Sequence, residues 1–128
     1  MRLLLDTHVL IWIVQNSPKI PQRVELLVKS TANQVFVSAA TAWEIATKVK
    51  AGKLPFDRPF LADFDASITA LAFTPLPMTA AHTVAAGLLA GAHKDPFDRV
   101  LAAQAQLEQL TIMTRDPALA LLGAQVAW

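Results

Sequence analysis

Residues Leu3-Leu4-Leu5-Asp6-Thr7-His8 open the chain with a short apolar run that stops abruptly at an acid. Three consecutive leucines favour a strand that is buried on both faces, as strands of parallel sheets are. From residue 7 to residue 15 the apolar side chains then recur at helical spacing. A buried strand that passes at once into a helix predicts an α/β fold.

Short apolar strands and helices alternate through the rest of the chain, which predicts a largely parallel sheet. Further strands are expected at residues 34–37, 110–113 and 125–128, with an extended, proline-containing segment at 73–76. Helices are expected at residues 21–30, 38–51, 58–71, 79–89, 95–109 and, briefly, from 116 onward. No internal repeat, low-complexity tract or linker interrupts this pattern, so we expect one domain over residues 1–128.

The composition indicates a globular protein with few surface charges. Of the 128 residues, 54% are hydrophobic and only 16% are charged, whereas an average domain carries about a quarter charged residues. We therefore expect part of the apolar surface to contact a partner or a second copy of the chain. The net charge is +1 and there is no polybasic stripe, a balance that neither requires nor excludes nucleic acid as a partner. If the chain acts on a nucleic acid, metal ions would have to neutralise part of the phosphate charge.

Nothing in the sequence predicts a membrane segment or disulfide chemistry. Asp6 comes too early for the apolar core of a signal peptide. The apolar stretch at residues 84–92 is much shorter than the roughly 20 residues that span a bilayer. The chain also has no cysteine. We expect a soluble, cytoplasmic protein.

The placement of the acidic residues is the most informative feature for function. Asp6 ends the first strand and Asp116 follows the strand at 110–113, and parallel sheets form their sites beyond such carboxyl ends. Glu44 lies early in the helix that follows the second strand, and Asp98 lies in the first turn of a later helix. Four carboxylates from four segments can therefore meet at one edge of the sheet.

Each acid also has a purely structural explanation. The aspartates that precede helices are suitable N-caps, namely Asp6, Asp95 and Asp116. Asp98 fits the preference for negative charge in a first helical turn, and Glu44 can pair with Lys48 at i, i+4. Taken singly, none of these acids distinguishes a cap or a helix pair from a metal ligand.

Taken together, the acids favour a metal site. A cluster of carboxylates without histidine or cysteine is a hard-oxygen site, which suits Mg²⁺ or Mn²⁺ better than zinc. Without a cation, their mutual repulsion would raise the pKa of some of them. Such a cluster is therefore most stable when it holds a metal ion.

The site acids lie in four stretches of the sequence, namely Leu3-Leu4-Leu5-Asp6-Thr7-His8, Ser38-Ala39-Ala40-Thr41-Ala42-Trp43-Glu44-Ile45, His93-Lys94-Asp95-Pro96-Phe97-Asp98-Arg99 and Thr114-Arg115-Asp116. In this order they resemble the PIN-domain ribonucleases, and in detail the VapC toxins of bacterial and archaeal toxin–antitoxin pairs. The resemblance continues to the closing Gly123-Ala124-Gln125-Val126 and so covers essentially the whole chain. Any one of these motifs is common, whereas all four in order are specific.

The resemblance implies a PIN-like α/β fold, with a twisted, mostly parallel sheet of about four or five strands and helices on both faces. It implies a catalytic and metal-binding quartet, namely Asp6, Glu44, Asp98 and Asp116. Asp95 is an additional acid in this pattern, either a further metal ligand or only the helix cap. Thr114 helps to position the site in relatives, and we also consider it as a substrate contact.

The resemblance further implies the function of the chain and its partners. The expected activity is Mg²⁺-dependent hydrolysis of RNA phosphodiesters, with Mn²⁺ as a possible substitute. Relatives of this kind pair with a cognate VapB-like antitoxin and usually form homodimers. Trp12 and Trp128 are either core aromatics or contacts at such interfaces. Which RNA is cut does not follow from the motifs.

Two arginines are candidate substrate ligands because each adjoins a predicted site aspartate. Arg99 and Arg115 could each clamp a phosphate with a planar guanidinium, or else lie on a solvated face or pair with an acid. His8, His82 and His93 are not spaced for a metal site or paired with a nucleophilic serine. We therefore do not expect a catalytic histidine.

Two other functions are compatible with parts of the sequence. A haloacid-dehalogenase-like phosphatase also places an aspartate after its first strand, but it needs a second one two positions later, where this chain has His8. A non-catalytic PIN-like module would bind RNA or a partner without cutting. The presence of all four quartet acids favours the enzyme over this module.

Overall fold

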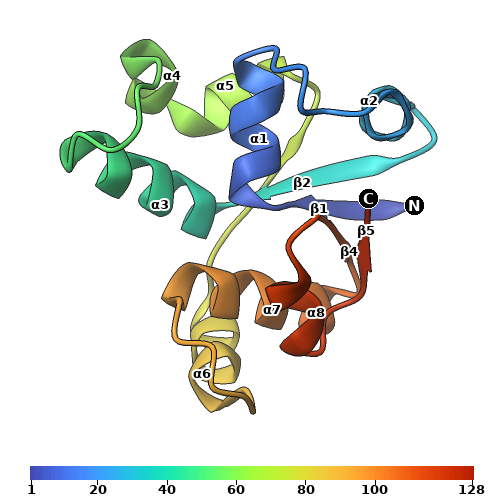
Figure 1. The fold of residues 1–128 in the computed structure, drawn as a ribbon, viewed down its shortest axis with the longest axis vertical. Helices are drawn as coiled ribbons and strands as arrows, with labels where there is room; N and C mark the ends of the chain where they lie inside the picture. The colour runs from blue at the N-terminus through green and yellow to red at the C-terminus, as the bar shows by residue number, and fades with distance from the viewer.

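Five short strands form one sheet in which every neighbouring pair is parallel, in the order β3-β2-β1-β4-β5. The computed structural model describes residues 1–128 and is shown in Figure 1. The strands are β1 Arg2–Leu5, β2 Gln34–Ser38, β3 Thr74–Leu76, β4 Thr111–Met113 and β5 Val126–Ala127. The predicted α/β class with a mostly parallel sheet is confirmed.

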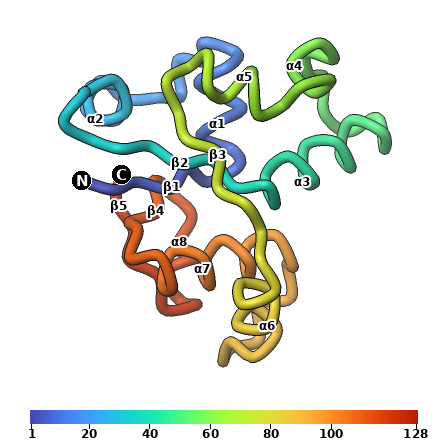
Figure 2. Tube along the Cα trace, turned by 180° about the vertical axis from the view of Figure 1, so that it is seen from behind, coloured from blue at the N-terminus to red at the C-terminus, as the bar shows by residue number.

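Eight helices connect and cover these strands. They are α1 Thr7–Val14, α2 Gln22–Lys29, α3 Ala39–Lys50, α4 Arg58–Ala62, α5 Phe64–Ala70, α6 Ala80–Leu88, α7 Pro96–Glu108 and α8 Pro117–Leu121. In both overall views α1, α2, α4 and α5 lie on one side of the sheet, and α6, α7 and α8 lie on the other (Figures 1 and 2). No helix combines the length and the apolar character needed to cross a bilayer.

The three leucines of β1 form the centre of the core because strand side chains alternate between the two faces. Leu3 and Leu5 pack in an apolar cluster with residues of α1, α2 and α5, whereas Leu4 packs against α7 and α8. All three side chains are completely buried. The expected burial of this strand on both faces is confirmed, and β1 occupies the middle of the sheet.

The helix expected at residues 58–71 is in fact two helices, so this prediction is wrong in its continuity. The backbone of Asp63 departs from helical geometry, with φ −141° and ψ 80°, and it separates α4 from α5. The Asp63 side chain accepts a hydrogen bond of 3.2 Å from the backbone N–H of Ala66. An aspartate that caps the second helix thus interrupts a segment whose apolar spacing is helical throughout.

The extended segment at 73–76 forms the edge strand β3, which pairs only with β2. Pro75 cannot donate a backbone hydrogen bond, and an edge position tolerates this loss because one side of the strand has no neighbour. Pro75 is therefore compatible with the position of β3 at the border of the sheet.

The register of the strands brings three chain segments to the same edge. Leu5 of β1 pairs with Met113 of β4, so Asp6 and Thr114 follow at equivalent positions, and the Asp6 N–H donates to the Met113 carbonyl at 3.1 Å. On its other side β1 pairs with β2. The last residue of β2, Ser38, caps α3 by accepting from the N–H of Ala40 at 3.0 Å. Helices α1, α3 and α8 consequently begin at the carboxyl edge of the sheet.

Candidate metal centre

Asp6 lies at the carboxyl end of the central strand and is only 4% exposed. Its Oδ1 accepts a hydrogen bond of 2.7 Å from the N–H of Thr7, and its Oδ2 accepts one of 2.7 Å from the hydroxyl of Thr114. Burial raises the pKa of Asp6 against the lowering effects of these hydrogen bonds and of His8, and the charge of Glu44 raises it further. Asp6 is therefore a buried carboxylate that gains from a nearby cation.

Thr114 connects Asp6 with Asp116. Its hydroxyl donates to Asp6 and accepts a hydrogen bond of 2.9 Å from the backbone N–H of Asp116. Asp116 caps α8 through Oδ1, which accepts from the N–H of Ala118 at 2.9 Å, and its side chain is exposed. These three residues line one cleft of about 210 Å³ together with His8 and other residues. The structure thus brings Asp6 and Asp116 to the same opening.

Glu44 reaches the site from α3 and is 4% exposed. Its Oε2 pairs with the Nζ of Lys48 at 2.6 Å, the helical i, i+4 pair expected from the sequence. The hydroxyls of Thr7 and Thr41 lie 3.1 Å apart in a buried hydrogen bond that joins the first turns of α1 and α3. This bond holds the helix that carries Glu44 against the end of β1, where the Glu44 charge acts on Asp6.

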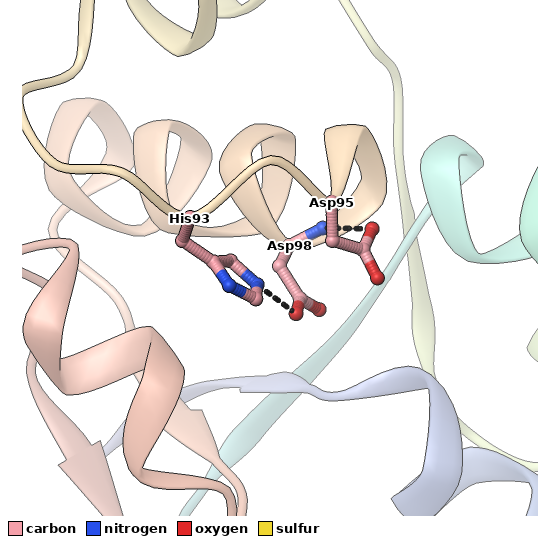
Figure 3. Close-up of side chains that lie close together, drawn as sticks. All are labelled: His93, Asp95 and Asp98. Atoms are coloured by element: carbon pink, nitrogen blue, oxygen red, sulfur yellow. Dashed lines mark hydrogen bonds and ion pairs between the residues drawn. The ribbon is translucent and has the colours of Figure 1, made fainter.

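Asp98, Asp95 and His93 form a compact group at the start of α7, shown in Figure 3. The Nε2 of His93 lies 2.7 Å from the Oδ2 of Asp98. Asp95 caps α7, since its Oδ1 accepts from the N–H groups of Phe97 at 2.9 Å and Asp98 at 3.2 Å. Ligand atoms of His93, Asp95 and Asp98 all lie within 4.8 Å of one another, and no other three acids or histidines approach as closely.

The electrostatics connect this group with the end of β1. Burial raises the pKa of Asp98 to about 6, and the charges of Asp95 and Asp6 add to the rise, while the hydrogen bond and charge of His93 oppose it. The charge of Glu44 thus raises the pKa of Asp6, and the charge of Asp6 raises the pKa of Asp98. Asp6 also lines a cleft with Asp116. Each of the other three acids of the predicted quartet is thus connected with Asp6, although only the group at His93 brings three ligand atoms within 4.8 Å of one another.

Helix N-termini surround these carboxylates and compensate part of their charge. Four helices begin at or beside the acids, namely α1 after Asp6, α3 at Ser38, α7 after Asp95 and α8 after Asp116. The free N–H groups of a first helical turn carry partial positive charge, which stabilises nearby carboxylates. The expected helix caps are therefore present, and they coexist with the cluster. At Asp95 and Asp116 capping engages Oδ1, and no hydrogen bond is made by Oδ2.

The donor set fits a hard divalent cation. Magnesium binds through one or two carboxylates and keeps several waters, so it does not require a closed cage of protein ligands. The quartet offers such carboxylates from four segments, and burial and mutual charge raise the pKa of two of them, Asp6 and Asp98. Asp95 has the geometry to add a ligand through Oδ2, and His93 can add a nitrogen.

The two candidate arginines have different surroundings. Arg99 donates to the backbone carbonyls of Ala86, Leu89 and His93, so its guanidinium ties the loop after α6 to the start of α7. These contacts point to a structural role that the sequence did not suggest, and phosphate binding by Arg99 remains only a prediction. Arg115 is exposed, lies 4.6 Å over the ring of Trp12, and lines the cleft that contains Asp6.

Sequence reasoning missed the part that His93 plays beside Asp98. The only available signal was its position five residues before Asp98, in the loop that leads into an aspartate-capped helix. His8 is exposed and lines the cleft. His82 is buried outside the cleft, where it forms a capping box of α6 with Thr79, and its Nε2 lies 2.9 Å from Oε1 of Glu108. Trp12 and Trp128 contact each other edge to face and pack against the core while remaining partly exposed.

Fold and site together define an α/β protein with an acidic cleft at the carboxyl edge of a parallel sheet. The chain belongs to the PIN domain family, whose sequence profile matches residues 3–124. PIN domains are generally nucleases, which supports a hydrolase activity. No curated protein matched the sequence.

Solved structures share this fold over nearly their full length. VapBC2 from Rickettsia felis, bound to a promoter DNA fragment, has a TM-score of 0.70 at 17% identity and covers 100% of this chain and 99% of the other. DNA-bound VapBC from Salmonella typhimurium gives 0.70 at 16%, covering 99% and 97%. FitAcB from Neisseria gonorrhoeae gives 0.65 at 21%, covering 97% and 95%. At these identities the likeness shows the fold, and it confirms the PIN-like architecture.

Proposed function

We propose that this protein is a metal-dependent endoribonuclease and the toxin of a VapBC-type toxin–antitoxin pair. The observation that carries the proposal is the setting of buried Asp6, whose pKa is raised by the charge of Glu44, whose own charge raises the pKa of Asp98, and which lines a cleft with Asp116. Negative charge gathered in this way is stabilised by a bound cation. A cation held beside an open cleft can promote phosphodiester hydrolysis, because it polarises a phosphate oxygen and activates water.

In the proposed site, Asp6, Asp98 and Asp116 hold Mg²⁺ or Mn²⁺. Glu44 holds the same ion or orients the attacking water, and Lys48 keeps its carboxylate in place. The bound metal would polarise a phosphate oxygen and lower the pKa of the attacking water. Thr114 keeps Asp6 and the start of α8 in register, and exposed Arg115 contacts a phosphate at the mouth of the cleft.

The proposed partners are an RNA substrate, a VapB-like antitoxin and a second copy of the chain. Three of the structurally similar proteins are described as VapBC complexes, and a low surface charge leaves apolar area that a partner could cover. An antitoxin would be expected to block the cleft. A non-catalytic PIN-like module would have the same partners but would bind RNA without hydrolysing it.

The test is cleavage of RNA by the purified protein in Mg²⁺, in Mn²⁺ and in EDTA. Asp116→Asn removes a carboxylate whose side chain is exposed, so loss of folding would not explain loss of activity. Asp65→Asn is the matched control, because Asp65 is an exposed aspartate on α5. We expect metal-dependent cleavage that is lost only in Asp116→Asn. Cleavage in EDTA, or equal cleavage by both variants, would contradict the mechanism.

The toxin role is tested separately, by expressing the chain in a bacterial host without its partner. Growth arrest by the unaltered chain and by Asp65→Asn, but not by Asp116→Asn, is the expected result. A chain that binds RNA without cutting it in any metal, and that leaves growth unaffected, would support the non-catalytic module.

A further inference from the structure

An aromatic pair, one ring exposed and the other partly buried, joins the two helices that carry Glu44 and Asp98. Trp43 lies on α3 and Phe97 in the first turn of α7, with ring centroids 4.7 Å apart and an interplanar angle of 76°. Each aromatic residue directly precedes a site carboxylate, since Glu44 follows Trp43 and Asp98 follows Phe97. The Trp43–Phe97 pair is therefore attached to the same two helical turns that supply half of the quartet.

Packing of the protein does not explain why Trp43 is an exposed tryptophan. It is 53% exposed and is the only aromatic residue among the large hydrophobic side chains at the surface. Apart from the aromatic pair itself, α3 and α7 are joined by buried aliphatic residues, since Ala40 belongs to one apolar cluster with Val100 and Ala103. No other large exposed apolar side chain lies on α3 or in the first turn of α7. An indole left in water in this way is available to a ligand.

We propose that the Trp43–Phe97 pair stacks a base of single-stranded RNA next to the phosphate that is cut. This inference rests on the proposed nuclease function and adds the residues that would stack a base. Phe97 packs edge to face with Trp43 and thereby limits its rotation, which prepares a rigid aromatic surface for stacking. Bases within a duplex present no free face, so such a surface selects unpaired nucleotides.

The charges around the pair favour a nucleotide over an apolar protein segment. The neighbouring carboxylates repel phosphate unless a cation is bound, so a flat, uncharged base beside them supplies attraction that the backbone lacks. Lys94, exposed in the loop before α7, lies close in sequence to Phe97 and can contact a flanking phosphate. The residues of α3 around Trp43 are small or polar, including exposed Ala46 and Thr47. They provide little further apolar area for a protein partner.

The experiment uses single-stranded RNA oligonucleotides in which 2-aminopurine replaces one base at a time. Asp116→Asn protein with Mg²⁺ serves as the background, so that binding is read without cleavage. We expect quenching of the 2-aminopurine fluorescence at one or two positions, and binding weakened roughly tenfold or more by Trp43→Ala. Trp43→Phe should retain most of the quenching, because a phenyl ring also stacks. Leu107→Ala, which truncates an exposed apolar residue at the far end of α7, is the control.

Three outcomes would overturn the inference. The first is equal binding of single-stranded and duplex RNA. The second is unchanged quenching in Trp43→Ala. The third is a change in oligomeric state with Trp43→Ala and no quenching in any variant, which would assign the pair to an interface between copies. If the unaltered protein binds and quenches the oligonucleotide but never cleaves it, the nuclease proposal fails while base stacking stands. If the protein cleaves RNA and its KM is unaffected by Trp43→Ala, base stacking fails while the nuclease proposal stands.

Discussion

The hydroxyl of Thr114 donates a hydrogen bond of 2.7 Å to the carboxylate of Asp6, across 108 residues of sequence. The same hydroxyl accepts from the N–H of Asp116 at 2.9 Å, so a single buried oxygen holds two acids of the candidate site. The hydroxyl has no hydrogen left to offer a substrate. Thr114 is therefore better described as a positioning residue than as the substrate contact that the sequence also allowed.

Replacement of Thr114 by valine should weaken both the fold and the site. The change keeps the side-chain shape but removes the donor to a buried carboxylate, and such a bond contributes about 1.5–3 kcal/mol. We expect a loss of this order in urea denaturation and weaker Mn²⁺ binding by calorimetry. Thr114→Ser, which keeps the hydroxyl, should restore most of both quantities. Equal behaviour of the valine and serine variants would contradict a role for the hydroxyl.

The metal-free protein should lose stability as the pH rises from about 4 to 6. Burial and neighbouring charges raise the pKa of Asp98 from 3.8 to about 6, so within this window the folded protein keeps a proton that the unfolded chain releases. Stability is therefore highest below this window and lower above it, by about 1–3 kcal/mol. The raised pKa of Asp6 acts in the same direction.

Thermal unfolding in EDTA at several pH values tests this dependence. Asp98→Asn, which cannot ionise, should flatten the slope and unfold at a higher temperature than the unaltered protein at pH 7.5. Addition of Mg²⁺ should stabilise the unaltered protein more at pH 7.5 than at pH 5, because protons compete with the metal for Asp98. If stability instead rises from pH 4 to 6 in EDTA, ionisation of Asp98 does not destabilise the metal-free protein, and the prediction is contradicted.

Arg99 should matter for stability. Arg99→Gln removes a guanidinium that donates to three backbone carbonyls and joins α6 to α7. We expect a loss on the order of 1–3 kcal/mol in urea denaturation. Arg58→Gln is the control, since Arg58 is an exposed arginine at the start of α4. Should Arg99→Gln be as stable as its control while its KM for RNA rises, phosphate binding would be the better explanation.

Arg115 should behave in the opposite way. Its guanidinium is exposed over the Trp12 ring at the cleft, a contact that contributes about 0.5–1 kcal/mol at an exposed site. Arg115→Gln should therefore unfold almost like the unaltered protein and show a KM for RNA several-fold higher, with kcat less affected. A lower kcat at constant KM would indicate a contact made only in the transition state.

Local patterns in the sequence predicted most of the fold because residues that are neighbours in sequence determine where buried strands lie and where helices begin. The leucine run required a strand buried on two faces, and Asp95 followed by Pro96 required a helix start. The break at Asp63 was missed because one capping side chain overrode a helical apolar spacing that continues on both sides. Arg99 and His93 could not be placed from sequence, since their partners depend on how the loop after α6 returns to α7. Such contacts between elements leave no periodic signal.

The central position of β1 also has a consequence for synthesis on the ribosome. Strand β1 is made more than a hundred residues before β4, so its second neighbour in the sheet is in place only much later. Closing so long a loop makes this pairing a late step. A nascent chain that ends before residue 111 contains Asp6 and Glu44 but lacks Thr114 and Asp116. The cleft therefore cannot form until the segment that contains Thr114 and Asp116 has been made and β4 has paired with β1.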